Sequence, residues 1–507
     1  MSSPRWFVRP FNRSTMATKA EIHMPTNAQG VEVKKHHEQQ QPGTDNTSHT
    51  NGDTCATRND ENAIANLKRE EIVLIVPSPN PEEGYLIYSL IEKPSSPSSS
   101  SPSEKASSSE NKTPFSLITT PYHATQLPED LSPFLVSEGG PPLHLRSSSD
   151  PRGRTVHVVV STHSGLKLAS AFYSAVLSPL LEVLGLSVTS PSSSPSTTSN
   201  GQYNLTTTQS ASSVKEFASS LSPSHPSTVL LLSGDGGVVD LINSFPVPNP
   251  PVTLALLPLG TANALFNSLH KNDSSASSSS SLVLALRTLF AGHAQQLPTF
   301  RASFSPGSTV VNGGDKVDHL RGAIVASHGF HASLVYESDT PEYRVHGSKR
   351  FGMAASELLK LSHAYDCSVS VRRPGSDGLV PLRPNDKFNY VLITLVSNLE
   401  KTFTISPDTK PLDGKLRLVY FGDVGGERTM DIMKGAYAEG KHVGMEDVGY
   451  EEVEEVRIEV KDGDERWRKV CVDGTIISLG EGGWMSVGMG DRTLAEGQGE
   501  GLSVLVG

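Results

Sequence analysis

The chain has 507 residues, a length that corresponds to two or three domains. Only 36% of the residues are hydrophobic and 19% are charged, whereas glycine (43) and proline (35) are frequent. This composition excludes a coiled coil and predicts one or two folded domains diluted by low-complexity segments. The formal net charge of −11 gives no general attraction for nucleic acid or an anionic lipid surface.

The cysteines and the hydropathy of the chain indicate its cellular compartment and its relation to membranes. Cys55, Cys367 and Cys471 lie far apart and form no CxxC pair. Their spacing argues against a disulfide framework or a zinc ribbon and fits a reducing compartment. No apolar run approaches the roughly 18 residues that span a bilayer. We therefore expect a cytoplasmic protein with peripheral, transient membrane contact.

The N-terminal segment has two interpretations. Its first acid is Glu21, and the preceding cations resemble an organelle presequence: Arg5, Arg9, Arg13 and Lys19. No sustained apolar face accompanies them, which favours a disordered basic tip. Mitochondrial import is the alternative localisation.

Polar, aperiodic sequence makes residues 1–68 a predicted disordered tail. Serine-rich tracts cannot form a core and are predicted to loop out: 94–112, 190–201 and 273–281.

Residues 69–150 form an extra β segment around the first serine tract. The runs at 71–76 and 85–91 indicate a hairpin, and 115–119 indicates a third strand. These strands have no obvious place in a parallel sheet, so the C-terminal β domain is a candidate location for them.

In residues 151–320 apolar strands alternate with helical stretches. The predicted strands are 155–160, 228–232 and 252–257, and the predicted helices are 167–184, 237–245 and 262–269. This alternation is typical of right-handed βαβ units and predicts an α/β domain with a parallel sheet.

Residues 321–507 read as a mainly antiparallel β domain, which we predict to be a sandwich. One helix, 353–363, interrupts strand-like runs at 322–327, 388–397, 416–421, 453–460, 468–472 and 485–488.

The sharpest motif is Ser233-Gly234-Asp235-Gly236-Gly237, directly after the strand at 228–232. Glycines there let the backbone approach a phosphate, and the acid lies where parallel sheets bind ligands. Such a carboxylate can position Mg²⁺ or accept a proton from an attacking hydroxyl. A tight Gly-Asp-Gly turn is the purely structural alternative.

A second loop, Pro258-Leu259-Gly260-Thr261-Ala262-Asn263, follows the next strand and opens a helix. Its small residues would expose backbone N–H groups and the Thr261 hydroxyl to phosphate. An ordinary helix cap by Thr261 is the structural alternative. Two such loops on successive strands predict a nucleotide site.

The two loops, with Asp240 and Asn243 after the first, resemble the catalytic domain of diacylglycerol kinases and related lipid kinases, and most closely sphingosine kinases. Ser161–Gly165 stands where relatives have an NPxSG loop. The resemblance continues through Gly329-Phe330, a YRxxGxxRF pattern at 343–351 and Val472-Asp473-Gly474. It covers about residues 155–488.

The resemblance implies ATP and Mg²⁺ as cofactors and a lipid as substrate. It also implies an α/β nucleotide-binding domain of the phosphofructokinase or NAD kinase type. Asp235 would be the catalytic carboxylate, Asp235 and Asp473 would bind the metal, and two arginines would neutralise phosphate. The implied nucleotide-binding residues are Ser164, Gly165, Ser233, Gly234, Gly236, Gly237, Gly260, Thr261, Asn263, Arg344, Arg350, Asp473 and Gly474.

Several positions depart from the family pattern. Ser161-Thr162 replaces Asn-Pro, Gly237 replaces Thr or Leu, and Thr475 replaces the acid of VDGE. The acid that reads a sphingoid base shortly after GF(x)A is missing, and Glu337 or Asp339 could supply it.

We therefore expect an ATP-dependent lipid kinase that phosphorylates the primary hydroxyl of a sphingoid base. A diacylglycerol or ceramide kinase is the alternative within enzymes. A degenerate kinase that binds lipid or nucleotide without transferring phosphate is the alternative outside them. His328 and His331 flank Gly329-Phe330 and are expected to be partly exposed structural histidines.

Overall fold

The computed structural model describes residues 67–80, 83–93, 113–124, 126–136, 140–147, 153–189, 201–246, 249–271, 279–347, 349–382, 387–489 and 501–507. Residues 1–66 of the predicted disordered tail (1–68) and most of the three serine tracts lie outside these ranges.

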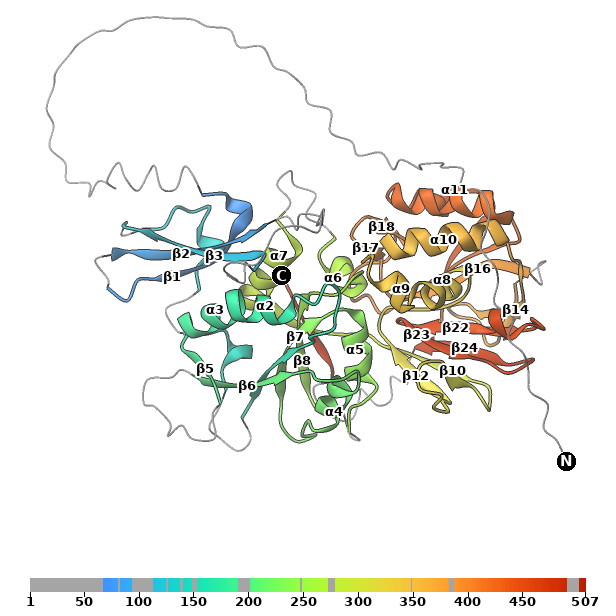
Figure 1. Cartoon of the computed structure of the whole chain (residues 1–507), viewed down its shortest axis with the longest axis horizontal. Coiled ribbons are helices and arrows are strands. Elements are labelled where there is room, and N and C mark those ends of the chain that lie inside the picture. The colour runs from blue at the N-terminus through green and yellow to red at the C-terminus, as the bar shows by residue number, and fades with distance from the viewer. Residues whose placement is uncertain are drawn as a thin grey trace, which may run out of the picture. The chain divides into compact units, whose positions relative to one another are not determined.

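A mainly parallel sheet forms the α/β region (Figure 1), with the order β5-β6-β4-β7-β8-β25-β9 among the described residues. Its strands are β4 (Thr155–Val160), β5 (Leu186–Val188), β6 (Gly201–Thr207), β7 (Ser227–Ser233), β8 (Val252–Pro258), β9 (His293–Gln296) and β25 (Ser503–Val506). Parallel pairing sets Val158 beside Leu230 and Leu230 beside Ala255. The carboxyl ends of β4, β7 and β8 therefore meet at one edge, as their sequence predicted.

Helices cover both faces of this sheet. Val229 and Leu231 of β7 join one apolar cluster, and Leu230 and Leu232 join the other. Burial on both faces explains why the strands are continuous apolar runs. The first cluster includes α4 (Ser213–Ser219), α5 (Asp235–Ile242) and α6 (Ala264–Leu269), and the second includes α2 (Ala169–Phe172), η5 (Tyr173–Leu177), α3 (Ser178–Val183) and α7 (Ser281–Ala291).

One helix and one serine loop differ from their predictions. The helix predicted at 167–184 runs through α2, η5 and α3, and η5 is a π-helical turn. Pro179 explains that turn, because it has no N–H and its ring crowds the carbonyl of Ala175. The loop predicted to reach residue 281 ends earlier, since the Ser280 hydroxyl accepts the Val283 N–H at 3.2 Å and caps α7.

The extra β segment forms its own antiparallel sheet of β1 (Ile72–Pro77), β2 (Tyr85–Glu92) and β3 (Phe115–Tyr122). The predicted hairpin is confirmed, but the proposed place in the C-terminal β domain is wrong. Leu74 and Tyr88 pack with residues of the α/β core instead. The Arg287 side chain of α7 binds the first residue of β1, because its Nε donates to the Ile72 carbonyl at 2.8 Å.

The C-terminal β region is one curled antiparallel sheet rather than the two sheets of a sandwich. Its strands are β10 (Phe300–Phe304), β11 (Thr309–Val310), β12 (His319–Gly322), β13 (Val325–Gly329), β14 (Tyr365–Arg372), β15 (Val380–Pro381), β16 (Lys387–Thr394), β19 (Leu416–Gly422), β20 (Val448–Val453), β21 (Glu455–Val460), β22 (Lys469–Val472), β23 (Thr475–Ser478) and β24 (Trp484–Met489). The strand predicted at 453–460 is β21, and Val453 at its start is the last residue of β20. A small hairpin pairs β17 (Asn398–Glu400) with β18 (Phe403–Thr404).

The chain exchanges strands across the predicted boundary at residue 320. β10 already pairs with β24 of the antiparallel sheet, upstream of that boundary. β25, near the C-terminus, returns to the first sheet and pairs in parallel with β8. The sequence does not predict either of these strand pairings, because a short apolar strand could join either sheet.

Helices α8 (Phe330–Ser338), α10 (Lys349–Leu361) and α11 (Gly425–Tyr437) lie on one side of the antiparallel sheet (Figure 1), and the short α9 (Pro341–Arg344) follows α8 along the chain. Only α10 was predicted, as 353–363. Short 3-10 helices are η1 (Arg69–Glu71), η3 (Ser132–Phe134), η4 (Leu143–Leu145), η6 (Lys441–Gly444) and η7 (Glu465–Trp467). Among the described helices none is both long and apolar enough to cross a membrane.

Candidate active site

Three loops meet at the carboxyl ends of β4, β7 and β8, and glycines make the contacts. A Cβ on Gly234 would lie 2.7 Å from the Gly260 Cα, and a Cβ on Gly260 would overlap Gly234. Gly165 has a φ of +51°, and a Cβ there would overlap the Leu259 carbonyl oxygen. The loops therefore approach backbone to backbone, which only glycine permits at these positions.

The two glycines after Asp235 have different surroundings. Gly236 is exposed, and no atom lies within 4 Å of a Cβ built on it, so its backbone is open to a ligand. A Cβ on Gly237 would overlap the Ser233 hydroxyl, which is buried beneath the first turn of α5. This packing gives a physical reason for glycine at 237, and it directs the Ser233 side chain into the fold.

Asp235 begins α5, and its carboxylate reaches the N-terminus of α6. Oδ2 accepts the Ala264 N–H at 2.8 Å, and Oδ1 accepts the Leu265 N–H at 3.2 Å. The residue as a whole is half-buried. Desolvation of its carboxyl group has the largest effect and raises the pKa of Asp235, whereas the hydrogen bonds from the two N–H donors lower it. The result is an oriented carboxylate with increased basicity.

The predicted nucleotide residue Asn263 stiffens the second loop. It adopts the left-handed region, with φ 53°, just before α6. Its side-chain oxygen accepts the Gly260 N–H at 3.0 Å, and its Nδ2 donates to the Gly260 carbonyl at 3.1 Å. Thr261 lies half-buried in the same turn. Asn263 thus shapes the loop that a phosphate would contact.

Asp473 and Gly474 form the turn between β22 and β23. The buried Asp473 carboxylate accepts backbone N–H groups of Ala323 at 2.6 Å, Val325 at 2.6 Å and Ile324 at 3.1 Å. Burial raises the pKa of Asp473 to about 7, and the charge of Asp235 adds to the rise. The two predicted metal carboxylates therefore interact electrostatically.

The donor set fits magnesium only as part of a larger site. Among the described residues, no group of three or more His, Cys, Asp or Glu side chains is arranged to hold a metal. Mg²⁺ commonly takes one or two carboxylates and completes its shell with substrate phosphates and water. Asp235 and Asp473 are compatible with that mode, although the Asp473 oxygens already accept three backbone donors.

The two predicted arginines converge on one acid. Arg344 donates from Nε to Asp339 Oδ1 at 2.9 Å and from Nη2 to Oδ2 at 2.7 Å. Arg350 donates from Nη1 to Asp339 Oδ1 at 3.2 Å. Glu337, the other predicted substrate acid, accepts from Arg466 Nε at 2.9 Å. Both candidate readers of a sphingoid ammonium group are therefore ion-paired.

The arginine segment adjoins the first glycine loop. A Cβ on Gly347, between Arg344 and Arg350, would lie 3.6 Å from a methyl carbon of Leu166. Leu166 follows Gly165, whose contact with Leu259 joins the two loops. The predicted Ser164 lies in this first loop and is half-buried.

Two polar contacts that link the site to the C-terminal β region, one to β12 and one to β17 of the small hairpin, were not predicted. The side chain of Asn243, directly after α5, donates to the Arg321 carbonyl at 2.9 Å and accepts the Arg321 N–H at 2.8 Å. The Ser268 hydroxyl of α6 donates to the Asn398 carbonyl at 3.1 Å and accepts its N–H at 3.0 Å. The family pattern marks Asn243, but nothing in the sequence marks Ser268.

The two histidines beside Gly329 are structural. His328 is buried, and its Nδ1 lies 2.9 Å from the Lys469 carbonyl oxygen, so the expected exposure is wrong for this residue. His331 is half-buried and its Nδ1 lies 2.7 Å from the Ser327 hydroxyl. Burial lowers the pKa of His331 to about 4.

Residues 156–301 match the family model of the diacylglycerol kinase catalytic domain. The chain carries a lipid kinase catalytic domain. This match contains all three glycine loops and Asp235. No protein of curated function matches the chain significantly.

Several solved structures that resemble the chain come from Bacillus anthracis str. Sterne. One, described as a candidate diacylglycerol kinase, has 16% sequence identity and a TM-score of 0.44, and the alignment covers 70% of this chain and 97% of that one. Another, described as a diacylglycerol kinase, has 13% identity and a TM-score of 0.39 over the same shares.

Proposed function

We propose that the protein is an ATP-dependent lipid kinase that transfers the γ-phosphoryl group to a primary lipid hydroxyl. The observation that carries the proposal is the placement of the Asp235 carboxylate beside three contacting glycine loops at the ends of parallel strands. Such an edge is the usual ligand site of an open α/β sheet.

In the reaction, the lipid oxygen forms a bond to the γ-phosphorus while the bond to the β,γ-bridging oxygen breaks and ADP leaves. The hydroxyl proton moves to, or is steered by, Asp235. Its two backbone donors fix the carboxylate, and its raised pKa suits a proton acceptor.

The nucleotide phosphates would lie against the open backbone at Gly236 and the loop at Gly260, with Arg344 and Arg350 neutralising their charge. Asp235 and Asp473 are the residues that would hold Mg²⁺ together with those phosphates. A bound Mg²⁺ would supply charge neutralisation at the transferred phosphoryl group. Catalysis would then consist mainly of positioning and electrostatic stabilisation.

The acceptor class has two candidates. The motifs resemble sphingosine kinases most closely and support a sphingoid base. Diacylglycerol or ceramide is favoured by the ion pair of Glu337 with Arg466, since this acid is then not free to bind a cationic amine. A neutral headgroup needs no such acid.

We also propose peripheral contact with the membrane that holds the substrate. Leu166 is 66% exposed and Val345 is 78% exposed. They lie in the first glycine loop and in the turn at Gly347, which touch each other. Apolar side chains at the entrance of a lipid-using site can enter the headgroup region transiently.

A screen with radiolabelled ATP tests the proposal. The protein is incubated with sphingosine, diacylglycerol or ceramide in mixed micelles, and labelled lipid is separated from ATP. Transfer to one of the three identifies the acceptor. ATP binding without transfer to any lipid would instead indicate a kinase homologue that has lost catalysis.

A further inference from the structure

Asp339 lies at the C-terminal end of α8, and its charge has no role in the transfer step. Its single carboxylate serves both proposed phosphate-binding arginines, through three donors at 2.7 to 3.2 Å. Arg344 uses its planar fork in the two-bond geometry with which guanidinium groups also bind phosphate. The carboxylate therefore occupies the donors that a phosphate would need.

Arg350 retains unused hydrogen-bonding capacity. Its Nε is buried and has no hydrogen-bond partner among the described residues. Burial and the positive charge of Arg344 lower the pKa of Arg350, and Asp339 opposes this effect. Two guanidinium groups share one carboxylate, which leaves one net positive charge and an unsatisfied donor. Both features favour a further anion at this position.

The arginine pair adjoins the phosphate loops. The turn at Gly347, which separates the two arginines, contacts Leu166 of the first loop. A nucleotide phosphate at the glycine loops would therefore be close to the arginines and would compete with Asp339 for their donors.

We propose that Asp339 is an internal counter-anion that occupies Arg344 and Arg350 in the nucleotide-free protein and is displaced from them by a nucleotide phosphate. This inference rests on the proposed function, in which these arginines bind phosphate. Asp339 keeps the two cations folded together before nucleotide binds, and it weakens nucleotide affinity by competing for them.

The test is isothermal titration calorimetry of the full chain with Mg-ATP, inorganic tripolyphosphate and adenosine. Asp339→Asn removes the charge and keeps the size of the side chain. We expect its Kd for Mg-ATP and tripolyphosphate to fall by about three- to tenfold and its Kd for uncharged adenosine to stay unchanged. The gain should shrink as salt rises from about 50 to 300 mM, because ions screen the added attraction.

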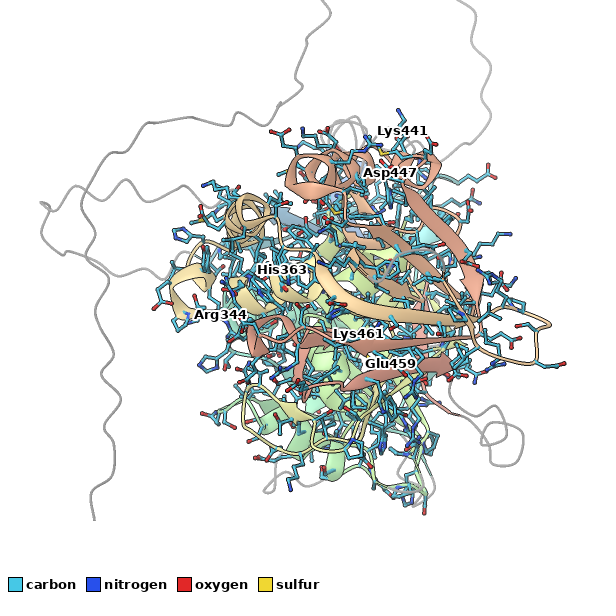
Figure 2. All side chains as sticks on the ribbon, turned by 90° about the vertical axis from the view of Figure 1, so that its right-hand side faces the viewer. Arg344, His363, Lys441, Asp447, Glu459 and Lys461 are labelled. Carbon is cyan, nitrogen blue, oxygen red and sulfur yellow. The ribbon has the colours of Figure 1, made fainter. Side chains whose placement is uncertain are left out.

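Asp447→Asn is the matched control. Asp447 accepts from Arg428 Nε at 2.7 Å, so the variant also removes one negative charge and breaks one Asp–Arg pair. Figure 2 shows Asp447 well apart from Arg344. Its nucleotide affinity should equal that of the wild type. Asp339→Ser repeats the measurement with a smaller side chain, in case the asparagine variant folds poorly.

An unchanged or weaker affinity in folded Asp339→Asn would overturn the inference. So would an equal gain for adenosine, because the effect would then not involve phosphate. If the wild type phosphorylates a lipid while Asp339→Asn binds ATP no more tightly, only this inference fails. If the wild type binds no ATP, the inference and the proposed function both fail.

Discussion

The contact between Gly234 and Gly260 gives the sharpest steric prediction for the nucleotide site. A Cβ on Gly234 would lie 2.7 Å from the Gly260 Cα, whereas ordinary contacts begin at 3.4 Å, so Gly234→Ala must separate the two loops by about 0.7 Å. The backbone of Gly234 is extended, with φ −108°, and alanine tolerates that conformation. The damage therefore comes from the collision alone. Overpacking of this kind costs about 1–3 kcal/mol.

Gly236→Ala is the matched control for stability in the same motif, because its Cβ would enter open space and cause no collision within the protein. We expect Gly234→Ala to lose about tenfold to a hundredfold in kcat/KM for ATP, since small displacements of positioning groups have effects of that size. Gly236→Ala should retain a melting temperature at or above the wild-type value. The assay is initial-rate kinetics with varied ATP, together with thermal unfolding of each variant. Equal kinetics of Gly234→Ala and wild type would refute the account of converging glycine loops.

The remaining predictions concern pH and membrane contact. The pKa of Asp473 is raised to about 7 in the folded protein, so the folded state holds a proton that the unfolded chain releases, and stability should fall as pH rises from about 4 to 7. Thermal unfolding of Asp473→Asn should show a flatter pH dependence over that window, and an unchanged slope would contradict the assignment. Val345→Asp should reduce sedimentation with neutral phospholipid vesicles several-fold while leaving the melting temperature unchanged, because Val345 is 78% exposed. Equal sedimentation of the variant and wild type would exclude this turn as the membrane contact.

The parallel sheet and its loops could be predicted because local sequence determines them. The strands before Gly234 and before Gly260 are apolar on both faces, and a glycine-rich loop follows each one. The residues at which the loops contact backbone to backbone can be recognised in the sequence because they are glycines. Asp235 was therefore predicted in position, although its capping of α6 was not.

Elements that depend on distant contacts escaped prediction. Helix α8 mixes polar and apolar residues without a clear stripe, and it is held by packing against β13 and β22. α11 begins with Gly425 and Gly426, which are poor helix formers. Its Ile432 is buried, but the sequence alone does not indicate that burial.

The charged residues show the same limit. The sequence contains Asp339 and both arginines, but their shared ion pair depends on how α8, α9 and α10 turn. Asp473 contacts backbone groups about 150 residues earlier in the chain. No local pattern in the sequence predicts these backbone contacts of Asp473.

The central claim is that Asp235 acts in phosphoryl transfer, and Asp235→Asn tests it most directly. Transfer of labelled phosphate from ATP to the accepted lipid should fall by about 10²- to 10⁴-fold, while calorimetry should still detect ATP binding to a folded protein. Asp431→Asn, which changes an exposed acid on α11 paired with Lys434, should retain wild-type transfer. Wild-type transfer by folded Asp235→Asn would contradict the proposed mechanism.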